Sequence, residues 1–188
     1  MTRIYFVRHA EPNYRNHDDA SRELSPRGMA ERELVTSFLL DKEISAVLSS
    51  PYRRAVDTVR HFADTVRLPV IHVNDFRERE VANEWIDDFN SFSRQQWADF
   101  DYALPGGECL RVVQERNIAA LQLVLQEYEG QNVVIGGHGT AISTVLNHYD
   151  PSFGNDGFER IRRLMPWIVR LDFSGTDLLG IEEFPLKS

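Results

Sequence analysis

Hydrophobic residues form two kinds of stretch along the chain, short continuous runs and longer segments with helical spacing. Four short runs are rich in β-branched and aromatic residues and predict buried strands: 3–7, 44–50, 70–73 and 132–137. Four longer segments place apolar side chains along one helical face and predict amphipathic helices: 24–43, 51–66, 107–129 and 140–149. The runs 165–174 and 177–184 predict a closing antiparallel pair joined by a Ser-Gly-Thr turn.

Two prolines and a glycine mark the ends of predicted helices. Pro26, after the cap residue Ser25, and Pro51 take first-turn positions, and Gly130 ends a helix. Strands that alternate with helices of this length are typical of an α/β fold with a mostly parallel sheet. We therefore expect residues 1–188 to form a single α/β domain.

One segment, 84–105, breaks the alternation. It is rich in Trp, Phe, Asp and Ser and has no clear period. We interpret it as an inserted, lid-like excursion. Its aromatic side chains either line a substrate site or pack a lid helix onto the body, and the sequence leaves both interpretations open.

Composition narrows the classes of function. Hydrophobic residues make up 42% of the chain and charged residues 27%, as in an ordinary globular protein. The formal net charge of −8 argues against nucleic acid as a partner, whereas a local arginine cluster still allows a small phosphorylated substrate. No run is long enough to span a membrane, no signal peptide is recognisable and there is one cysteine, so we expect a cytoplasmic protein. Nothing in the sequence excludes a homodimer.

Three predicted strands are followed directly by residues suited to phosphate chemistry. These residues are Arg8 and His9, then Arg53 and Arg54, and finally His138 in the run GGHGT. Because ligands bind at the carboxyl ends of parallel strands, we expect these side chains to meet at one edge of the sheet.

The chemistry of these side chains favours a phosphoryl-transfer site. Guanidinium groups match phosphate oxygens, and the helix after the glycines around His138 offers backbone N–H groups to an anion. Nearby guanidinium charges lower the pKa of a histidine and favour its neutral, nucleophilic form. Two histidines among arginines make a poor metal site, so we expect neither a metal nor a cofactor.

The segment FVRHAEPN (6–13) resembles the Arg-His-Gly motif that opens the histidine phosphatase superfamily, which includes the cofactor-dependent phosphoglycerate mutases. Five later segments resemble further landmarks of the family in the same order: LSPRG (24–28), LSSPYRRAVDT (48–58), FRER (76–79), PGGEC (105–109) and VVIGGHGTAIS (133–143). The resemblance implies a three-layer α/β/α sandwich, with helices on both faces of a mostly parallel central sheet.

The resemblance also implies a role for each matching residue. His9 would be the phosphorylated nucleophile and Glu78 the proton donor to the leaving oxygen. Arg8, Arg54 and His138 would hold the phosphoryl oxygens. The complete phosphate- or substrate-binding set that we expect is Arg8, His9, Asn13, Arg54, His138 and Gly139.

Three positions depart from the family pattern. Ala10 replaces a glycine, which is acceptable only if its φ is not positive. Pro12 stands where Ser or Thr often helps to hold phosphate, so the resemblance implies one donor fewer. Cys109 replaces a frequent serine.

Two of the implied residues have a competitor nearby. Neighbours on a helix point about 100° apart, so only one of Arg53 and Arg54 can face the site. The register of the motif favours Arg54, and it favours Glu78 over Glu80. The polar residues 17–19 either line the pocket or form a solvated loop, and we favour the loop.

The sequence thus predicts a metal-independent phosphomonoester hydrolase that acts on a small phosphorylated substrate through a phosphohistidine. Two alternatives stay open: a cofactor-dependent phosphoglycerate mutase, and a catalytically idle protein that binds a phosphorylated ligand or a protein partner. The mutases that the chain resembles are generally longer, with extra segments over the site. A chain of 188 residues has less to shield a phosphohistidine from water, which favours hydrolysis.

Overall fold

The computed structural model describes residues 1–186, which form six strands, six α-helices and one 3₁₀-helix. The strands are β1 (Thr2–Arg8), β2 (Ile44–Ser49), β3 (Val70–His72), β4 (Asn132–Gly137), β5 (Trp167–Ser174) and β6 (Asp177–Pro185). The helices are α1 (Pro26–Leu39), α2 (Arg53–Val66), α3 (Phe89–Ala98), α4 (Leu110–Glu127), α5 (Gly139–Tyr149) and α6 (Asn155–Ile161), with the 3₁₀-helix η1 at Asn74–Phe76.

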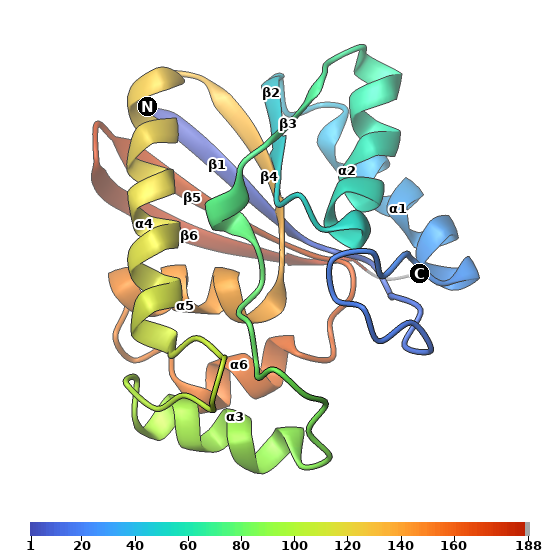
Figure 1. Cartoon of the computed structure of the whole chain (residues 1–188). Helices are drawn as coiled ribbons and strands as arrows, with labels where there is room; N and C mark the ends of the chain where they lie inside the picture. Colours follow the sequence, from blue (N-terminus) through green and yellow to red (C-terminus); the bar gives the residue numbers. More distant parts are fainter. Residues whose placement is uncertain (187–188) are drawn as a thin grey trace.

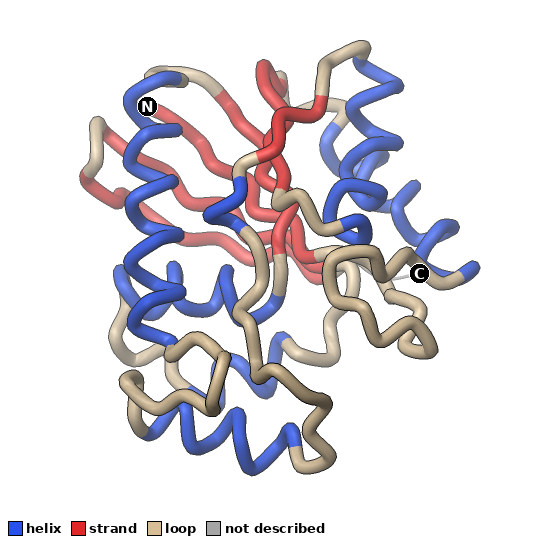
Figure 2. The backbone as a smooth tube through the Cα atoms, in the orientation of Figure 1, coloured by secondary structure: helices blue, strands red, loops and turns tan. Residues whose placement is uncertain are grey.

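All six strands belong to one sheet in the order β3-β2-β4-β1-β5-β6 (Figure 2). The four strands from β3 to β1 run parallel, while β5 is antiparallel to both β1 and β6. The mostly parallel sheet and the closing antiparallel pair are therefore confirmed. Gly175, at the turn of that pair, has a φ of 58°, a conformation that glycine adopts without strain.

Helices cover both faces of the sheet, which confirms the three-layer arrangement. Alternate side chains of β1 point to opposite sides: Ile4 and Phe6 join the core beneath α4 and α5, whereas Tyr5 and Val7 join the core beneath α1 and α2. Figure 1 shows α1 and α2 together on one side of the sheet, away from α4 and α5. Every buried strand thus contributes to two cores, as its continuous apolar run requires.

Helix α6 was not predicted from the sequence, whereas α3 agrees with one of the two interpretations of the segment 84–105, a lid helix packed onto the body. Helix α3 lies inside the segment 84–105 and packs against α6, with Trp97 5.8 Å from Phe158 between ring centroids. Its buried face includes the polar Ser93 and Gln96, which interrupt the apolar spacing. Helix α6 has only seven residues, too few to show a period. No helix among residues 1–186 is both long and apolar enough to cross a membrane.

The strand pairing brings three strand ends to one edge of the sheet. In the parallel register, Arg8 at the end of β1 lies opposite Gly137 of β4, and Ser49 of β2 lies opposite Gly136. The segments that follow these three strands therefore start side by side. This edge carries the candidate site.

Helix α4 offers a matched test of the core. Leu121 is fully buried, whereas Leu123 on the same helix is 66% exposed. We expect Leu121→Ala to lower the free energy of unfolding by about 2–5 kcal/mol, because it leaves a cavity in the core. Leu123→Ala should change it by less than about 0.5 kcal/mol. Urea unfolding followed by circular dichroism measures both, and equal effects would contradict the described packing.

Candidate active site

The site is built where the chain leaves β1, β4 and β2. The His9 N–H donates to Gly137 O at 3.1 Å and the Ser50 N–H to Gly136 O at 2.9 Å, so the sheet ladder continues one residue past each strand. The next N–H, that of Ala10, donates to Thr58 Oγ1 of α2 at 3.0 Å. These bonds hold the backbone on both sides of His9 rigidly.

A single hydrogen bond decides which nitrogen of His9 is free. Its Nδ1 lies 2.8 Å from the carbonyl oxygen of Ala10. A carbonyl only accepts, so Nδ1 carries the proton and the neutral ring keeps a lone pair on Nε2. Burial lowers the pKa of His9 well below its usual value, and the charges of Arg54 and Arg8 lower it further. The result is a neutral imidazole with an available nucleophilic nitrogen.

His138 lies beside His9, with 5.4 Å between the ring centroids. It caps the start of α5 and is completely buried. Its Nε2 lies 2.8 Å from Ser50 Oγ, and its Nδ1 has no protein partner among the described residues. Burial, followed by the charge of Arg54, lowers the pKa of His138 well below its usual value.

Arg8 is buried and held from behind by the end of α6. Its Nη1 donates to Ile161 O at 2.6 Å and to Leu164 O at 3.0 Å. A Cβ at Gly139 would lie 3.0 Å from Arg8 Nε, so the glycine permits this close approach. Burial lowers the pKa of Arg8 to about 10, which leaves the group charged at neutral pH.

Arg54 faces the site and Arg53 does not. Arg54 is buried, and its Nη2 lies 3.0 Å from Asp19 Oδ1 while its Nη1 donates to the Asp19 carbonyl. Burial also lowers the pKa of Arg54. The side chain of Arg53 is exposed and pairs with Asp57 on the next turn of α2.

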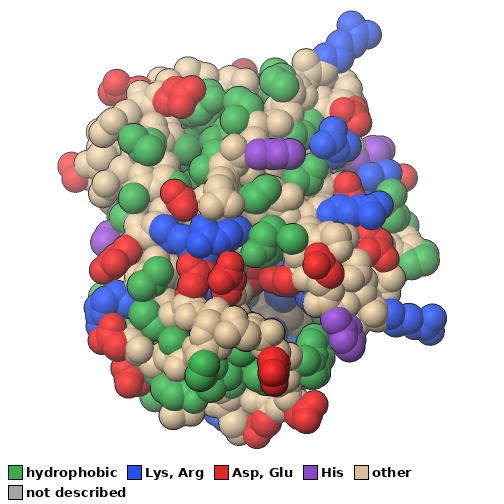
Figure 3. All heavy atoms as spheres, in the orientation of Figure 1, with side chains coloured by type: hydrophobic (Ala, Val, Ile, Leu, Met, Phe, Trp, Pro, Cys, Tyr) green, Lys and Arg blue, Asp and Glu red, His purple; other side chains and the backbone are tan. Residues whose placement is uncertain are grey.

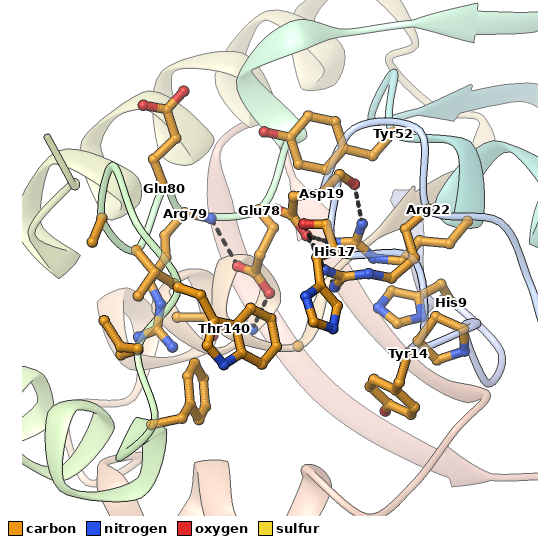
Figure 4. A pocket seen from close by; sticks show the side chains of 18 of the residues that line it. His9, Tyr14, His17, Asp19, Arg22, Tyr52, Glu78, Arg79, Glu80 and Thr140 are labelled. Atoms are coloured by element: carbon orange, nitrogen blue, oxygen red, sulfur yellow. Dashed lines mark hydrogen bonds and ion pairs between the residues drawn. The ribbon is translucent and has the colours of Figure 1, made fainter.

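Glu78 lies across the site from the histidines, against the N-terminus of α5. Its Oε2 accepts the Thr140 N–H at 3.1 Å, and its Oε1 accepts the Ala141 and Arg79 N–H groups at 3.1 and 3.0 Å. Figure 4 shows Glu78 directed toward Thr140 and the carboxylate of Glu80 turned away. Both residues line the cavity, but only Glu78 reaches toward its centre.

A separate ion-pair cluster holds the backbone that carries Glu78. Arg116 donates to the carbonyls of Asp75, Arg77 and Glu78, and its Nε and Nη2 bind Glu108 at 2.9 and 2.8 Å. Glu108 Oε2 also accepts the Glu80 N–H at 3.0 Å. This cluster attaches the segment 75–80 to the start of α4.

A cavity of about 890 Å³ lies at this edge of the sheet. Figure 3 shows a hollow on this face with acidic side chains gathered beside it. Of the predicted set, Arg8, His9, Arg54, Glu78 and Gly139 line the cavity, and His138 lies behind His9. The side chain of Asn13 is bound to Glu23 and does not line it.

The structure adds residues of the 17–19 loop to the lining of the cavity. Residues 17–19 lie in a loop on the surface, as expected, and His17 and Asp19 of that loop also line the cavity. His17 stacks on Trp85 with 4.3 Å between centroids. Nothing in the local sequence signals either contact, because both partners are distant in the chain.

The departures from the family pattern are accommodated locally. Ala10 is not among the residues with positive φ, so alanine meets the backbone requirement at that position. Pro12 lines the cavity without an N–H to offer. Cys109 caps α4 without a side-chain hydrogen bond. Within residues 1–186, no group of three His, Cys, Asp or Glu side chains could hold a metal ion.

Comparison with known proteins yields one family and several relatives. The model of the histidine phosphatase superfamily (branch 1) matches residues 4–177. A Bacillus subtilis protein named uncharacterized phosphatase PhoE is 23% identical, over 93% of this chain and 90% of its own. A metal-independent phosphoserine phosphatase from Arabidopsis thaliana is 28% identical, over 77% of this chain and 67% of its own. The solved structure of Bacillus stearothermophilus YhfR has a TM-score of 0.81 at 20% identity, and the match covers 95% of this chain and 94% of that one.

The low pKa values of the two histidines predict how stability depends on pH. Below about pH 6.5, His9 and His138 become protonated in the unfolded chain but stay neutral in the folded protein. Protonation therefore stabilises the unfolded state, and the free energy of unfolding should fall as pH decreases. Each histidine contributes up to about 1.4 kcal/mol per pH unit in that window. His9→Gln should remove its share, giving a shallower slope between pH 7 and 5.5 in urea unfolding. Identical slopes for the two proteins would contradict a buried neutral His9.

Proposed function

Since the chain belongs to the histidine phosphatase superfamily, branch 1, and is an enzyme that hydrolyses phosphate esters, we propose that His9 is its nucleophile. The hydrogen bond from Nδ1 to Ala10 O is the observation that carries this proposal, because it leaves Nε2 free for attack. The lowered pKa keeps the ring unprotonated at neutral pH.

In the first step, His9 Nε2 attacks phosphorus and forms the N–P bond while the ester P–O bond breaks. Protonated Glu78 gives its proton to the leaving alkoxide, and its Oε2 accepts only one backbone hydrogen bond, which leaves a lone pair for that proton. In the second step, Glu78 takes a proton from water, the water oxygen bonds to phosphorus and the N–P bond breaks. The products are the alcohol and inorganic phosphate.

The remaining residues stabilise charge on the transferring group. Arg8 and Arg54 present guanidinium groups to the phosphoryl oxygens, and His138 lies beside His9 at the start of α5. Such donors act most strongly in a buried site, where water does not screen them. Asn13 is left out of this scheme because its amide is bound to Glu23.

The substrate that we propose is a small phosphomonoester in the cytoplasm. A relative that shares 28% identity is named a metal-independent phosphoserine phosphatase, which supports a small phosphorylated substrate for this chain too. The cavity of about 890 Å³ is large enough for such a molecule.

His9→Ala tests the nucleophile. We expect the variant to lose phosphate release from glycerol 1-phosphate by at least about 10³-fold, because the group that forms the covalent intermediate is removed. Phosphate release in EDTA, together with acid-labile ³²P on the wild-type protein only, measures this. Wild-type turnover in the variant would overturn the mechanism.

Rapid isomerisation of 3-phosphoglycerate by the wild-type protein, with little release of free phosphate, would instead make the enzyme a mutase.

Glu78→Gln and Glu80→Gln form a matched pair for the proton donor. Glu78→Gln should lower kcat for glycerol 1-phosphate by about 10²–10⁴-fold, because an alkoxide needs a proton to leave. The same variant should lose much less with 4-nitrophenyl phosphate, whose leaving group needs none. Glu80→Gln should behave as wild type with both esters. A larger loss from Glu80→Gln would assign the role to Glu80.

A further inference from the structure

Asp19 brings a negative charge into a site that otherwise attracts anions. Its side chain is partly exposed and lines the cavity, in the loop between β1 and α1. Figure 4 shows Asp19 between Glu78 and Arg22. A carboxylate at this place repels a phosphoryl group, because like charges interact strongly where little water screens them. Asp19 thus opposes the ligand that the arginines of the site attract.

The carboxylate acts on one of the two arginines that we propose to hold phosphate. Asp19 Oδ1 lies 3.0 Å from Nη2 of the buried Arg54, and the Asp19 carbonyl accepts a hydrogen bond from Nη1. Arg8 differs, because its Nη1 binds the neutral carbonyls of Ile161 and Leu164 and it has no ion pair among the described residues. A phosphoryl group that binds Arg54 therefore shares this guanidinium with Asp19, whereas Arg8 is free of such competition.

Further contacts keep the Asp19 carboxylate at the site. Arg22 Nη1 lies 3.2 Å from the same Oδ1 that binds Arg54. The backbone of the loop is held as well, because the Arg53 N–H at the start of α2 donates to Ala20 O at 3.0 Å. Neither contact depends on Arg54. We therefore expect the carboxylate to stay beside Arg54 when a phosphoryl group binds.

We propose that Asp19 is a positioning residue that acts through Arg54: its charge lowers the affinity of the site for phosphate and speeds release of the product. This inference rests on the proposed function, in which inorganic phosphate is the last product. Two arginines beside a helix N-terminus bind a dianion tightly, and a tightly held product slows turnover. The carboxylate offsets part of that attraction.

Asp19→Asn removes the charge and nearly preserves the shape of the side chain. Since the backbone carbonyl still binds Arg54, we expect a folded variant. The competitive Ki of inorganic phosphate, measured against 4-nitrophenyl phosphate, should fall about 10-fold, because the charge of Arg54 is no longer offset. An unchanged or higher Ki would overturn the proposal, since loss of a group that only orients Arg54 would weaken phosphate binding.

The dissociation rate of phosphate tests the effect on product release. It should fall by a factor similar to that of the Ki, because changes of affinity within one site appear mostly in the dissociation rate. Stopped-flow displacement of bound phosphate by vanadate, followed by tryptophan fluorescence, measures this rate. A variant with a wild-type dissociation rate would contradict the role of Asp19 in release.

Asp18→Asn is the matched control. Asp18 is the neighbouring residue and has the same charge, but its carboxylate accepts the Ser21 N–H at 2.7 Å and does not line the cavity. The Ki of phosphate should stay within about twofold of wild type, because water and salt screen an exposed, more distant charge. An equal fall in both variants would mean that the net charge of the loop sets the affinity, and would overturn the specific role of Asp19.

This inference and the proposed function fail in different ways. Calorimetric titration with inorganic phosphate measures binding without turnover. If wild type released no phosphate from any ester, the proposed function would fail, while tighter binding of phosphate by Asp19→Asn would still support the effect of its charge. If wild type hydrolysed esters and Asp19→Asn bound phosphate no more tightly, only this inference would fail.

Discussion

The parallel pairing of β1 with β4 is the constraint on which the site depends. Its register places Arg8 opposite Gly137, so the residues that follow the two strands, His9 and His138, emerge as neighbours. The two histidines are 129 positions apart in the chain, and only this ladder brings them together. The ladder is in turn held by two cores, because alternate residues of β1 are buried on opposite faces of the sheet. A shift of the register by one residue would reverse these faces and separate the histidines.

The site gains its chemistry from burial of groups that water would otherwise solvate. Desolvation is the largest cause of the lowered pKa values of Arg8, His9 and His138. Desolvation keeps the rings of both histidines neutral. It also strengthens the interaction of the Arg8 charge with an anion, because little water is present to screen it. The fold tolerates this because backbone carbonyls of α6, Thr58 and the sheet ladder satisfy the neighbouring donors. An anionic ligand therefore compensates an arrangement that is unfavourable without it.

Several distant segments hold the side chains at the required places. The N-terminus of α5 holds Glu78, the start of α4 holds its backbone through Arg116 and Glu108, and the end of α6 holds Arg8. Helix α3 contacts the same segment through Arg79. Glu78, Arg8 and Arg79 are thus held by four different helices packed at one edge of the sheet.

The resemblance to the family motif favoured Arg54 over Arg53, and the side chain of Arg53 is indeed exposed. The sequence by itself determined the α/β alternation and the strand ends that carry Arg8, His9 and His138. Those features follow from local periodicity and from the common direction of parallel strands. Tertiary structure alone decided the contact of Asp19 with Arg54, the place of His17 against Trp85 and the unpaired Nε of Arg79. These are contacts between irregular loops or polar faces, which have no period to read. Whether a charge is left without a partner depends on what packs around it in three dimensions, and no linear pattern carries that information.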